Sequence, residues 1–135
     1  MKILILGAGR VGSSLASTLS KQQYEVSIVD LNKNRLQRLQ EDLDLATEVG
    51  HGSYPSTLKK VGADEETILL AVTNSDECNI TACQIAKSKF NVKKTICRLS
   101  DASYLNSLSA FGENNIDIAI SPENEVTEHL VDLIK

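Results

Sequence analysis

Hydrophobic positions along the chain alternate between short unbroken runs and longer stretches with helical spacing. The first run, Ile3 to Leu6, is continuously apolar and ends at Gly7. An apolar run of this length is typical of a strand buried on both faces, as in a parallel sheet. Apolar residues then recur every three or four positions from Val11 to Leu19. This second pattern predicts an amphipathic helix that packs on the strand.

Five further runs rich in aliphatic and β-branched residues predict strands. They span residues 24–29, closed by Asp30, and residues 45–49, 67–72, 94–99 and 116–120. Six strands that alternate with helices are the pattern of βαβ units, and right-handed crossovers place helices on both faces of the sheet. The pattern therefore predicts an α/β fold, a Rossmann-like doubly wound parallel sheet of six strands in the order 3-2-1-4-5-6.

Polar residues at the starts of the helical stretches predict where the helices begin. We expect Asn32 to cap the second helix, residues 55–61 to form a short third, and Asn74 to cap the fourth with Glu77 as its capping-box partner. Ser100 is expected to cap a fifth helix that carries Tyr104, Leu105, Leu108 and Phe111. Ser121, Pro122 and Glu123 open a last helix at about 122–135, with Val126, Leu130, Leu133 and Ile134 on one apolar face.

Composition and charge narrow the class of protein. With 135 residues, 41% of them hydrophobic and 24% charged, the chain reads as one globular domain, 1–135. Its net charge of −4 argues against a nucleic-acid partner. The three cysteines, Cys78, Cys83 and Cys97, form no Cys-x-x-Cys pair, so we expect reduced thiols rather than a disulfide or zinc site. No apolar run reaches membrane-spanning length, and we expect a soluble, cytoplasmic chain.

The sequence from Gly7 to Gly12 predicts a dinucleotide-binding loop. Gly7-Ala8-Gly9-Arg10-Val11-Gly12 fits G-x-G-x-x-G and lies directly between a predicted strand and a predicted helix. In this motif the first glycine permits the turn, the second lets the backbone approach a pyrophosphate, and the third lets the helix pack closely on the strand. The helix start offers unpaired N–H groups and the positive end of its dipole. Arg10 either reaches phosphate oxygens or is a solvated first-turn residue.

Asp30 ends the second strand and follows Gly12 by 18 residues. A carboxylate at this place binds the hydroxyls of the adenosine ribose. It also repels a 2′-phosphate, so NAD or an adenine nucleotide fits better than NADP. A role in capping the next helix is an alternative that is compatible with ribose binding.

Weaker signals lie at the ends of the other strands. His51 follows the third strand, close to the expected place of an adenine edge, but a histidine in a simple turn would look the same. Thr73 and Asn74 follow the fourth strand, across the switch point from Gly7, where helix capping explains them equally well. Arg98 ends the fifth strand and faces either the phosphates or a partner subunit.

No set of residues predicts catalysis. Asp76, Glu77 and Glu123 lie in first turns of helices, where interaction with the helix dipole is the default and a metal ion the alternative. His129 is the other histidine of the chain and lies far along the last helix. Because no nucleophile stands out beside a general base, the sequence predicts no catalytic residue.

Several segments together resemble a known family. They are Met1 to Gly12, Val29-Asp30, Gly50 to Ser53, Gly62 to Asp64, Ala71 to Thr73, Ser75 to Asn79 and Ile120 to Glu123. With these segments the chain resembles the RCK N-terminal (TrkA-N) domain found in regulatory proteins of bacterial potassium uptake. The resemblance covers essentially all 135 residues.

The resemblance implies a nucleotide sensor rather than an enzyme. Family members bind NAD(H), or ATP and ADP, in the Rossmann crevice. They assemble as dimers or rings on the cytoplasmic face of a potassium-translocating membrane subunit, and ligand exchange gates ion flow. In such relatives the last helix crosses to a partner or to a further lobe, which would cover its apolar face. The alternative is the NAD-binding domain of a truncated oxidoreductase.

The resemblance also assigns roles to individual positions. Residues Gly7, Ala8, Gly9, Arg10, Val11 and Gly12 would bind phosphates, Asp30 the ribose, Gly50 and His51 the adenine, and Thr73 and Asn74 the distal half of the ligand, with Arg98 and Glu123 less securely placed. Many relatives carry Gly-Asp-Ala after the third strand, where this chain has Gly50-His51-Gly52. That departure favours the Trk uptake branch and NAD(H), with ATP or ADP as the alternative.

Overall fold

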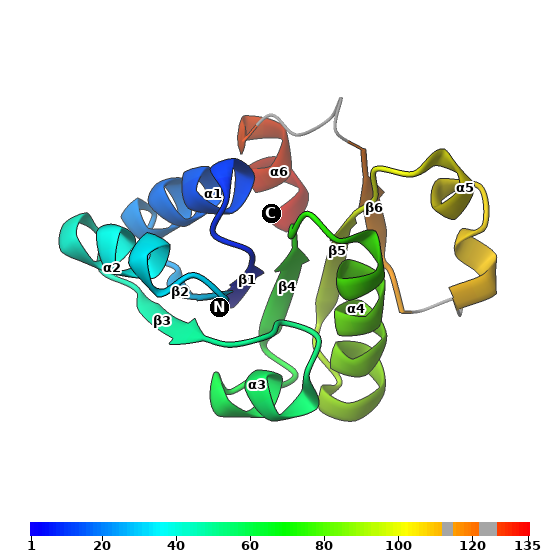
Figure 1. Cartoon of the computed structure of the whole chain (residues 1–135), viewed down its shortest axis with the longest axis horizontal. Helices are drawn as coiled ribbons and strands as arrows, with labels where there is room; N and C mark the ends of the chain where they lie inside the picture. The colour runs from blue at the N-terminus through cyan, green and yellow to red at the C-terminus, as the bar shows by residue number, and fades with distance from the viewer. Residues whose placement is uncertain (112–114, 122–126) are drawn as a thin grey trace.

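The computed structural model describes residues 1–111, 115–121 and 127–135 (Figure 1). The strands are β1 (Lys2–Leu6), β2 (Glu25–Asp30), β3 (Ala46–Val49), β4 (Thr67–Ala71), β5 (Lys94–Arg98) and β6 (Ile118–Ile120). The helices are α1 (Arg10–Lys21), α2 (Lys33–Asp42), α3 (Pro55–Lys60), α4 (Asp76–Phe90), α5 (Ala102–Leu105), the 3-10 helix η1 (Leu108–Phe111) and α6 (Thr127–Ile134). None of the helices described is long and apolar enough to cross a membrane.

The six strands form one parallel sheet in the order β3-β2-β1-β4-β5-β6, which confirms the predicted topology. β1 lies between β2 and β4, so the chain reverses its direction of travel across the sheet beside β1. In a doubly wound sheet this reversal opens a crevice at the carboxyl ends of the strands. Backbone bonds fix the region: Gly7 N donates to Val29 O at 2.8 Å and Val72 N to Leu6 O at 3.0 Å.

The sheet is buried on both faces, and alternate residues of each strand face opposite sides. Ile3 and Ile5 of β1 belong to the core beneath α1, α2 and α6, whereas Leu4 and Leu6 belong to the core beneath α3 and α4. Figure 1 shows these two groups of helices on opposite sides of the sheet. This double burial explains why β1 and β4 are continuous apolar runs.

The start of α4 differs from the prediction. Ser75, not Asn74, is the N-cap, and its hydroxyl accepts from Cys78 N at 3.1 Å. A serine hydroxyl at the N-cap satisfies one of the free amides of the first turn as well as an asparagine does. Asn74 is thereby left to line the crevice. The predicted Asn32 cap of α2 is confirmed, since its side chain accepts from Asn34 N and Arg35 N.

The fifth predicted helix is also different. Asp101 is its N-cap rather than Ser100, and its carboxylate accepts from Ser103 N. The helix ends at Leu105 and the separate 3-10 turn η1 follows it. Ser100 is not the N-cap because its amide donates to the Asp76 carboxylate on α4 at 2.9 Å. This bond holds Ser100 outside the helix.

The apolar face of α6 is covered within the chain. Leu130, Val131 and Ile134 are buried in the core that α1 shares with the sheet, and α6 packs on α1. The expectation that this face lacks a cover is therefore wrong for Leu130 and Ile134. The sequence shows an amphipathic stripe but not the neighbour against which it packs. The predicted start of this helix, with Pro122, Glu123 and Val126, lies outside the described residues.

All three cysteines are free, as expected. Cys83 of α4 and Cys97 of β5 are both buried, while Cys78 is partly exposed at the crevice. A hydrogen bond with the Cys97 thiol, together with burial, raises the pKa of Cys83 well above its usual value. Both effects disfavour the thiolate, so Cys83 behaves as a small apolar core residue.

Candidate nucleotide-binding site

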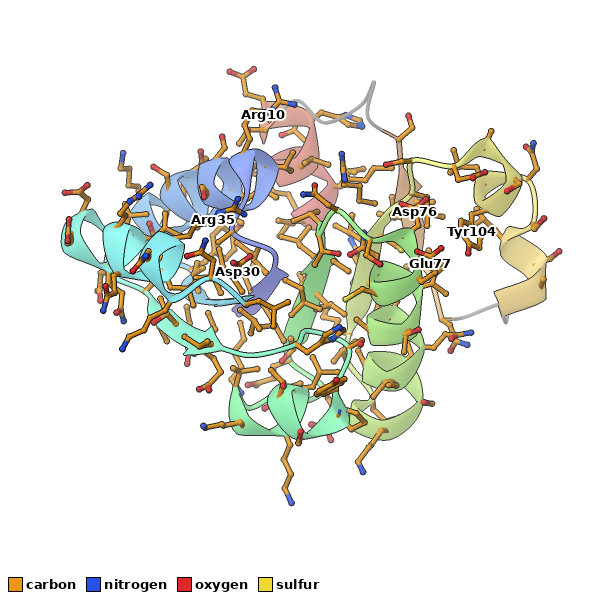
Figure 2. All side chains as sticks on the ribbon, in the orientation of Figure 1. Arg10, Asp30, Arg35, Asp76, Glu77 and Tyr104 are labelled. Carbon is orange, nitrogen blue, oxygen red and sulfur yellow. The ribbon has the colours of Figure 1, made fainter. Side chains whose placement is uncertain are left out.

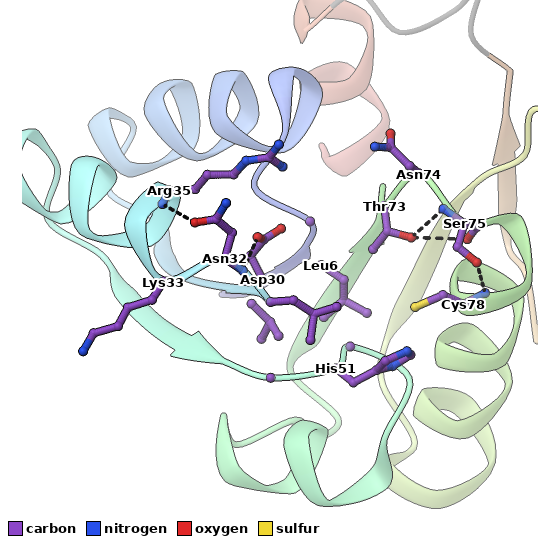
Figure 3. Close-up of a pocket in the computed structure, with 15 residues that line it drawn as sticks. Leu6, Asp30, Asn32, Lys33, Arg35, His51, Thr73, Asn74, Ser75 and Cys78 are labelled. Carbon is purple, nitrogen blue, oxygen red and sulfur yellow. Dashed lines mark hydrogen bonds between the residues drawn. The ribbon is translucent and has the colours of Figure 1, made fainter.

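A cavity of about 710 Å³ opens at the carboxyl ends of β1, β2, β3 and β4 (Figure 3). Its lining comprises Leu6, Gly7, Val29, Asp30, Leu31, Asn32, Lys33, Arg35, Gly50, His51, Gly52, Thr73, Asn74, Ser75 and Cys78. We call residues 7–12 and 30–35 the first wall, and residues 73–79 with Arg98 the second wall. A volume in this range suits a cofactor-sized ligand.

The glycine loop of the first wall has the backbone geometry that the motif predicts. Gly7 has φ +106°, a conformation that residues with a side chain rarely adopt. A Cβ on Gly12 would lie 1.7 Å from Gly7 O, so only glycine lets α1 approach β1 this closely. A Cβ on Gly9 would meet nothing nearer than Arg35 Nη1 at 4.0 Å. The backbone at Gly9 is therefore open to a ligand.

Asp30 fastens two segments of the first wall together. Its Oδ1 accepts from Ala8 N and its Oδ2 from Asn32 N, both at 2.8 Å. The carboxylate thus holds the glycine loop against the start of α2. Each oxygen of an ionised carboxylate has a further lone pair, so Asp30 can also accept from ligand hydroxyls in the cavity it lines.

His51 lies on the opposite side of the cavity from α1, and its ring is fixed in place (Figure 3). Nδ1 accepts from Ser53 N at 3.3 Å, and Ser53 Oγ lies 2.9 Å from the same atom. The ring stacks on Tyr54 with centroids 4.5 Å apart. Because a backbone amide can only donate, the proton of the neutral imidazole belongs on Nε2. His51 therefore offers one N–H donor on an oriented aromatic ring.

Asn79 organises the second wall, and the sequence analysis missed it. It is fully buried, and its Oδ1 accepts from Thr73 N at 3.0 Å and from Thr73 Oγ1 at 2.7 Å. Its Nδ2 donates to Thr73 O at 3.1 Å and to Arg98 O at 2.9 Å. These bonds tie the end of β4 to the end of β5. The available signal was an asparagine inside a helix, where it is unfavourable unless it has a specific partner.

Asp76 has a structural role that its position in the first turn of α4 did not reveal. Its carboxylate accepts from Ser100 N at 2.9 and 3.1 Å and from Asp101 N at 2.9 Å. Its oxygens therefore fasten the loop after β5 to α4. Beside it, Tyr104 Oη donates to Glu77 Oε1 at 3.1 Å across the gap between α5 and α4 (Figure 2). This hydrogen bond is the main cause that raises the pKa of Tyr104.

The structure divides the predicted site residues into three groups. Gly7, Asp30, Gly50, His51, Thr73 and Asn74 line the large cavity. Ala8, Gly9 and Arg10 line a smaller cavity beside it, of about 320 Å³. Val11, Gly12 and Arg98 line neither cavity: Val11 and Gly12 pack inward, and Arg98 Nη1 donates to Thr73 O at 3.2 Å. Glu123 lies outside the described residues.

Several lining residues were not expected from the sequence. Leu31 is 69% exposed although it is apolar, and it lines the cavity just after Asp30. An exposed leucine that lines a cavity can cover a flat apolar surface such as a purine ring. Arg35 lines the large and the small cavity alike. Both residues follow the second strand closely, and that proximity was the available signal.

The sequence matches the family model described as the TrkA-N domain over residues 3–122. It is 42% identical over 137 residues to a Trk system potassium uptake protein TrkA from Halomonas elongata, covering 100% of this chain and 30% of that protein. A Trk system potassium uptake protein TrkA from Vibrio alginolyticus is 41% identical over 138 residues, with the same coverage of 100% and 30%. The chain thus spans about three tenths of the length of these curated relatives.

Solved structures share the fold at low sequence identity. The NAD(P)-binding domain of an exopolyphosphatase-related protein from Archaeoglobus fulgidus aligns with TM-score 0.77 and 17% identity over 98% of this chain and 96% of that one. A GsuK channel bound to NAD aligns with TM-score 0.70 and 17% identity over 88% of this chain and 21% of that one. GsuK bound to ADP aligns with TM-score 0.69 and 17% identity over 89% and 31%.

Proposed function

Because the chain belongs to the TrkA-N domain family, we propose that it is a nucleotide-sensing domain of a Trk-type potassium uptake system. The observation that carries this proposal is the unobstructed space at Gly9, where an added Cβ would meet nothing nearer than 4.0 Å, in the smaller cavity beside the one of about 710 Å³. An unobstructed glycine at the start of a helix is the arrangement that binds a pyrophosphate. The sequence relatives are potassium uptake proteins, which supports the physiological context.

We assign the ligand-binding roles as follows. The amides of the glycine loop, residues 7–12, bind the phosphates, and Asp30 accepts from the ribose hydroxyls. Gly50 and His51 border the adenine, with the Nε2–H of His51 as a donor. Thr73 and Asn74 border the distal half of the ligand, and Arg98 supports them through its bond to Thr73 O.

NAD(H) is the first candidate ligand, and ATP or ADP is the alternative. The G-x-G-x-x-G loop is the dinucleotide fingerprint, and Asp30 suits the adenosine ribose of either ligand class. Channel structures of the same fold are described as bound to NAD and to ADP. Those ligands belong to the channels, and they make both nucleotide classes reasonable to test here.

The proposed output is a change of conformation rather than a chemical conversion. A ligand that contacts the first wall through phosphates and the second wall through Thr73 binds best when the two walls are at one spacing. Differential binding of two nucleotides would then shift the population between two arrangements of the domain. We propose that this shift reaches a potassium-translocating membrane subunit on the cytoplasmic side. In this proposal residues 1–135 act as one domain within a homodimer or ring, in which α6, whose apolar face packs on α1, would contribute its outer face as the crossover or dimer helix.

Calorimetric titration of the purified chain with NADH, NAD, ATP and ADP tests the proposal. We expect binding at sub-millimolar concentration, competition between NADH and ATP for one site, and a thermal shift on binding. No binding of any of the four nucleotides would overturn it.

The alternative function is the cofactor domain of an oxidoreductase, and absorbance at the NADH wavelength separates it from sensing. The test is made on the longer protein that contains this chain, supplied with candidate hydride acceptors. Sensing predicts binding without loss of NADH. Steady consumption of NADH with any acceptor would favour the oxidoreductase.

A further inference from the structure

The smaller cavity extends beyond the glycine loop, and the roles assigned so far do not include its arginines on α2, Arg35 and Arg38. It has a volume of about 320 Å³. Its lining comprises Ala8, Gly9, Arg10, Ser13, Arg35, Arg38 and Leu39. Arg35 belongs to the linings of both cavities, so the small cavity continues the large one past the glycine loop.

Arg35 is directed at the loop rather than at solvent alone. Figure 3 shows its side chain reaching from α2 toward the first turn of α1. Its Nη1 is the nearest atom to the space above Gly9, at 4.0 Å from the position of an added Cβ. Arg38 lies one helical turn further along α2, on the same cavity, and Arg10 lines it from α1 and points outward (Figure 2).

These guanidinium groups have no anionic partner in the described part of the chain. The ion pairs found there join Lys2 to Asp64, Lys60 to Glu48 and Lys87 to Asp117. None of them includes Arg10, Arg35 or Arg38. The first turn of α1 adds to the positive potential, because it contains no acidic residue and Gly9 provides no side-chain cap.

The local charge is opposite to that of the whole chain. The two cavities together are lined by four cationic side chains, Arg10, Lys33, Arg35 and Arg38, and by one carboxylate, Asp30. The whole chain has net charge −4. Cations gathered in one place repel one another, and an acidic protein that gathers them beside an anion-binding helix start is suited to a ligand with several negative charges.

We propose that Arg35, with Arg38 behind it, binds a phosphate group of the nucleotide in addition to the two at the glycine loop. This assignment departs from NAD(H) as the first candidate: the preferred ligand is an adenine nucleotide with one phosphate more than ADP or NADH carries. Two sources supply that chemistry: the terminal phosphate of ATP, or the 2′-phosphate of NADPH, which a nearby arginine accommodates in this fold. The proposal rests on the function proposed above and specifies the ligand of the same site.

The position of Asp30 does not oppose this assignment. Considered alone, its carboxylate repels a 2′-phosphate. In the structure both of its oxygens accept from backbone amides, those of Ala8 and Asn32. These bonds partly balance its charge, and the Arg35 guanidinium provides an opposite charge on the same cavity.

The test compares two ligand pairs by calorimetry at one fixed ionic strength: NADPH with NADH, and ATP with ADP. We expect the ligand with the extra phosphate to bind about tenfold more tightly in at least one pair. A gain in the ATP pair identifies a terminal phosphate, and a gain in the NADPH pair a 2′-phosphate. If NADH and ADP bind and neither pair shows a gain, the proposal is overturned while the proposed function stands. If no nucleotide binds, the proposed function itself fails.

Variants show whether the arginines cause the gain. Arg35→Gln is expected to bring the affinity ratio of the responding pair close to one, and Arg38→Gln to lower it less. Lys21→Gln is the matched control, since it removes the same charge from the far end of α1. Arg35 is exposed, so its loss should leave the melting temperature unchanged, which circular dichroism checks. An affinity ratio that survives in Arg35→Gln would also overturn the proposal.

Discussion

The two walls of the crevice use their polar groups in opposite ways. In the first wall, a Cβ added to Gly9 would meet nothing nearer than Arg35 Nη1 at 4.0 Å, and Arg35 forms no ion pair among the described residues. In the second wall, Asn79 is fully buried and makes four hydrogen bonds. Asp76, 8% exposed, is engaged with the amides of Ser100 and Asp101.

This difference distinguishes residues that are available to bind a ligand from residues that stabilise the folded chain. A polar group that is already hydrogen-bonded within the protein contributes little binding free energy to a ligand. A polar group without such a partner can contribute a new hydrogen bond. A fully satisfied buried network also rigidifies the segment that it holds. We therefore expect changes at Asn79 and Asp76 of the second wall to act mainly on stability, and changes at the open positions of the first wall to act mainly on binding. Four predictions test this division, beginning with the largest effect.

Gly12→Ala should destabilise the protein the most, although Gly12 belongs to the first wall. The new Cβ would lie 1.7 Å from Gly7 O, a backbone atom that cannot rotate away. We expect the free energy of unfolding to fall by about 4 kcal/mol or more, at the upper end for overpacking. Urea denaturation measures it.

Gly9→Ala, in the same loop, is the control for this overpacking. An added Cβ meets no atom closer than 4.0 Å there, so stability should change by less than about 0.5 kcal/mol while NADH binding weakens. Equal destabilisation by the two substitutions would contradict the difference between Gly12, which close packing requires, and Gly9, which has free space around it.

Asn79→Ala should be the most destabilising change in the second wall. It leaves the amide of Thr73 and the carbonyls of Thr73 and Arg98 without their buried partner. Unsatisfied buried groups of this kind cost about 2–3 kcal/mol in total. Chemical denaturation tests this against Asn34→Ala, an exposed position on α2 that should shift stability by less than about 0.5 kcal/mol. If Asn79→Ala loses no more stability than Asn34→Ala, Asn79 does not hold the second wall together.

Asp30→Ala should reduce nucleotide affinity. The substitution removes the proposed ribose acceptor and releases the amide of Ala8, which is buried, and that of Asn32, which is exposed. We expect NADH or ATP affinity to fall about tenfold, or about 1.4 kcal/mol. Asp42→Ala, at the far end of α2, removes the same charge and should bind like the wild type. Unchanged affinity in Asp30→Ala would contradict the ribose role.

The smallest expected effect is a loss of stability at acid pH that depends on Asp101, at the edge of the second wall. The Ser103 hydroxyl and amide donate to the Asp101 carboxylate and lower the pKa of that group. A carboxyl with a lower pKa in the folded state contributes stability above its unfolded pKa, and this contribution is lost as pH falls through the folded pKa. Unfolding measured between about pH 6 and about pH 2 should show wild type and Asp101→Asn converging at the acid end. A stability difference that stays constant across this range would contradict it.

Much of the fold follows from local patterns. The apolar runs from Ile3 to Leu6 and from 67 to 72 predict strands buried on both faces, and the alternation of strands and helices leads to the observed strand order. The roles of Gly7 and Gly12 in the turn and in packing also follow from spacing. Sequence suffices here because each feature depends on a short-range periodicity or on the steric requirement at one residue.

The remainder depends on which segments meet. Ser75 or Asn74 could each cap α4, and only the structure shows that Ser75 does so, with its hydroxyl on Cys78 N. The apolar stripe of α6 is visible in the sequence, but its burial against α1 is a long-range contact. The same holds for Arg35, whose side chain reaches from α2 to the glycine loop at the start of α1, 26 residues earlier in the chain.

The sequence by itself determined the sheet, its order and the loop at the crevice, because hydrophobic period and glycine sterics are local. Only the tertiary structure decided that Asn79 is enclosed, that Asp76 holds the loop after β5, and that α6 closes over its own domain. Those outcomes require contacts with residues that are distant in the sequence. The same polar side chain is solvated at the surface or buried and hydrogen-bonded, depending on which distant residues pack against it.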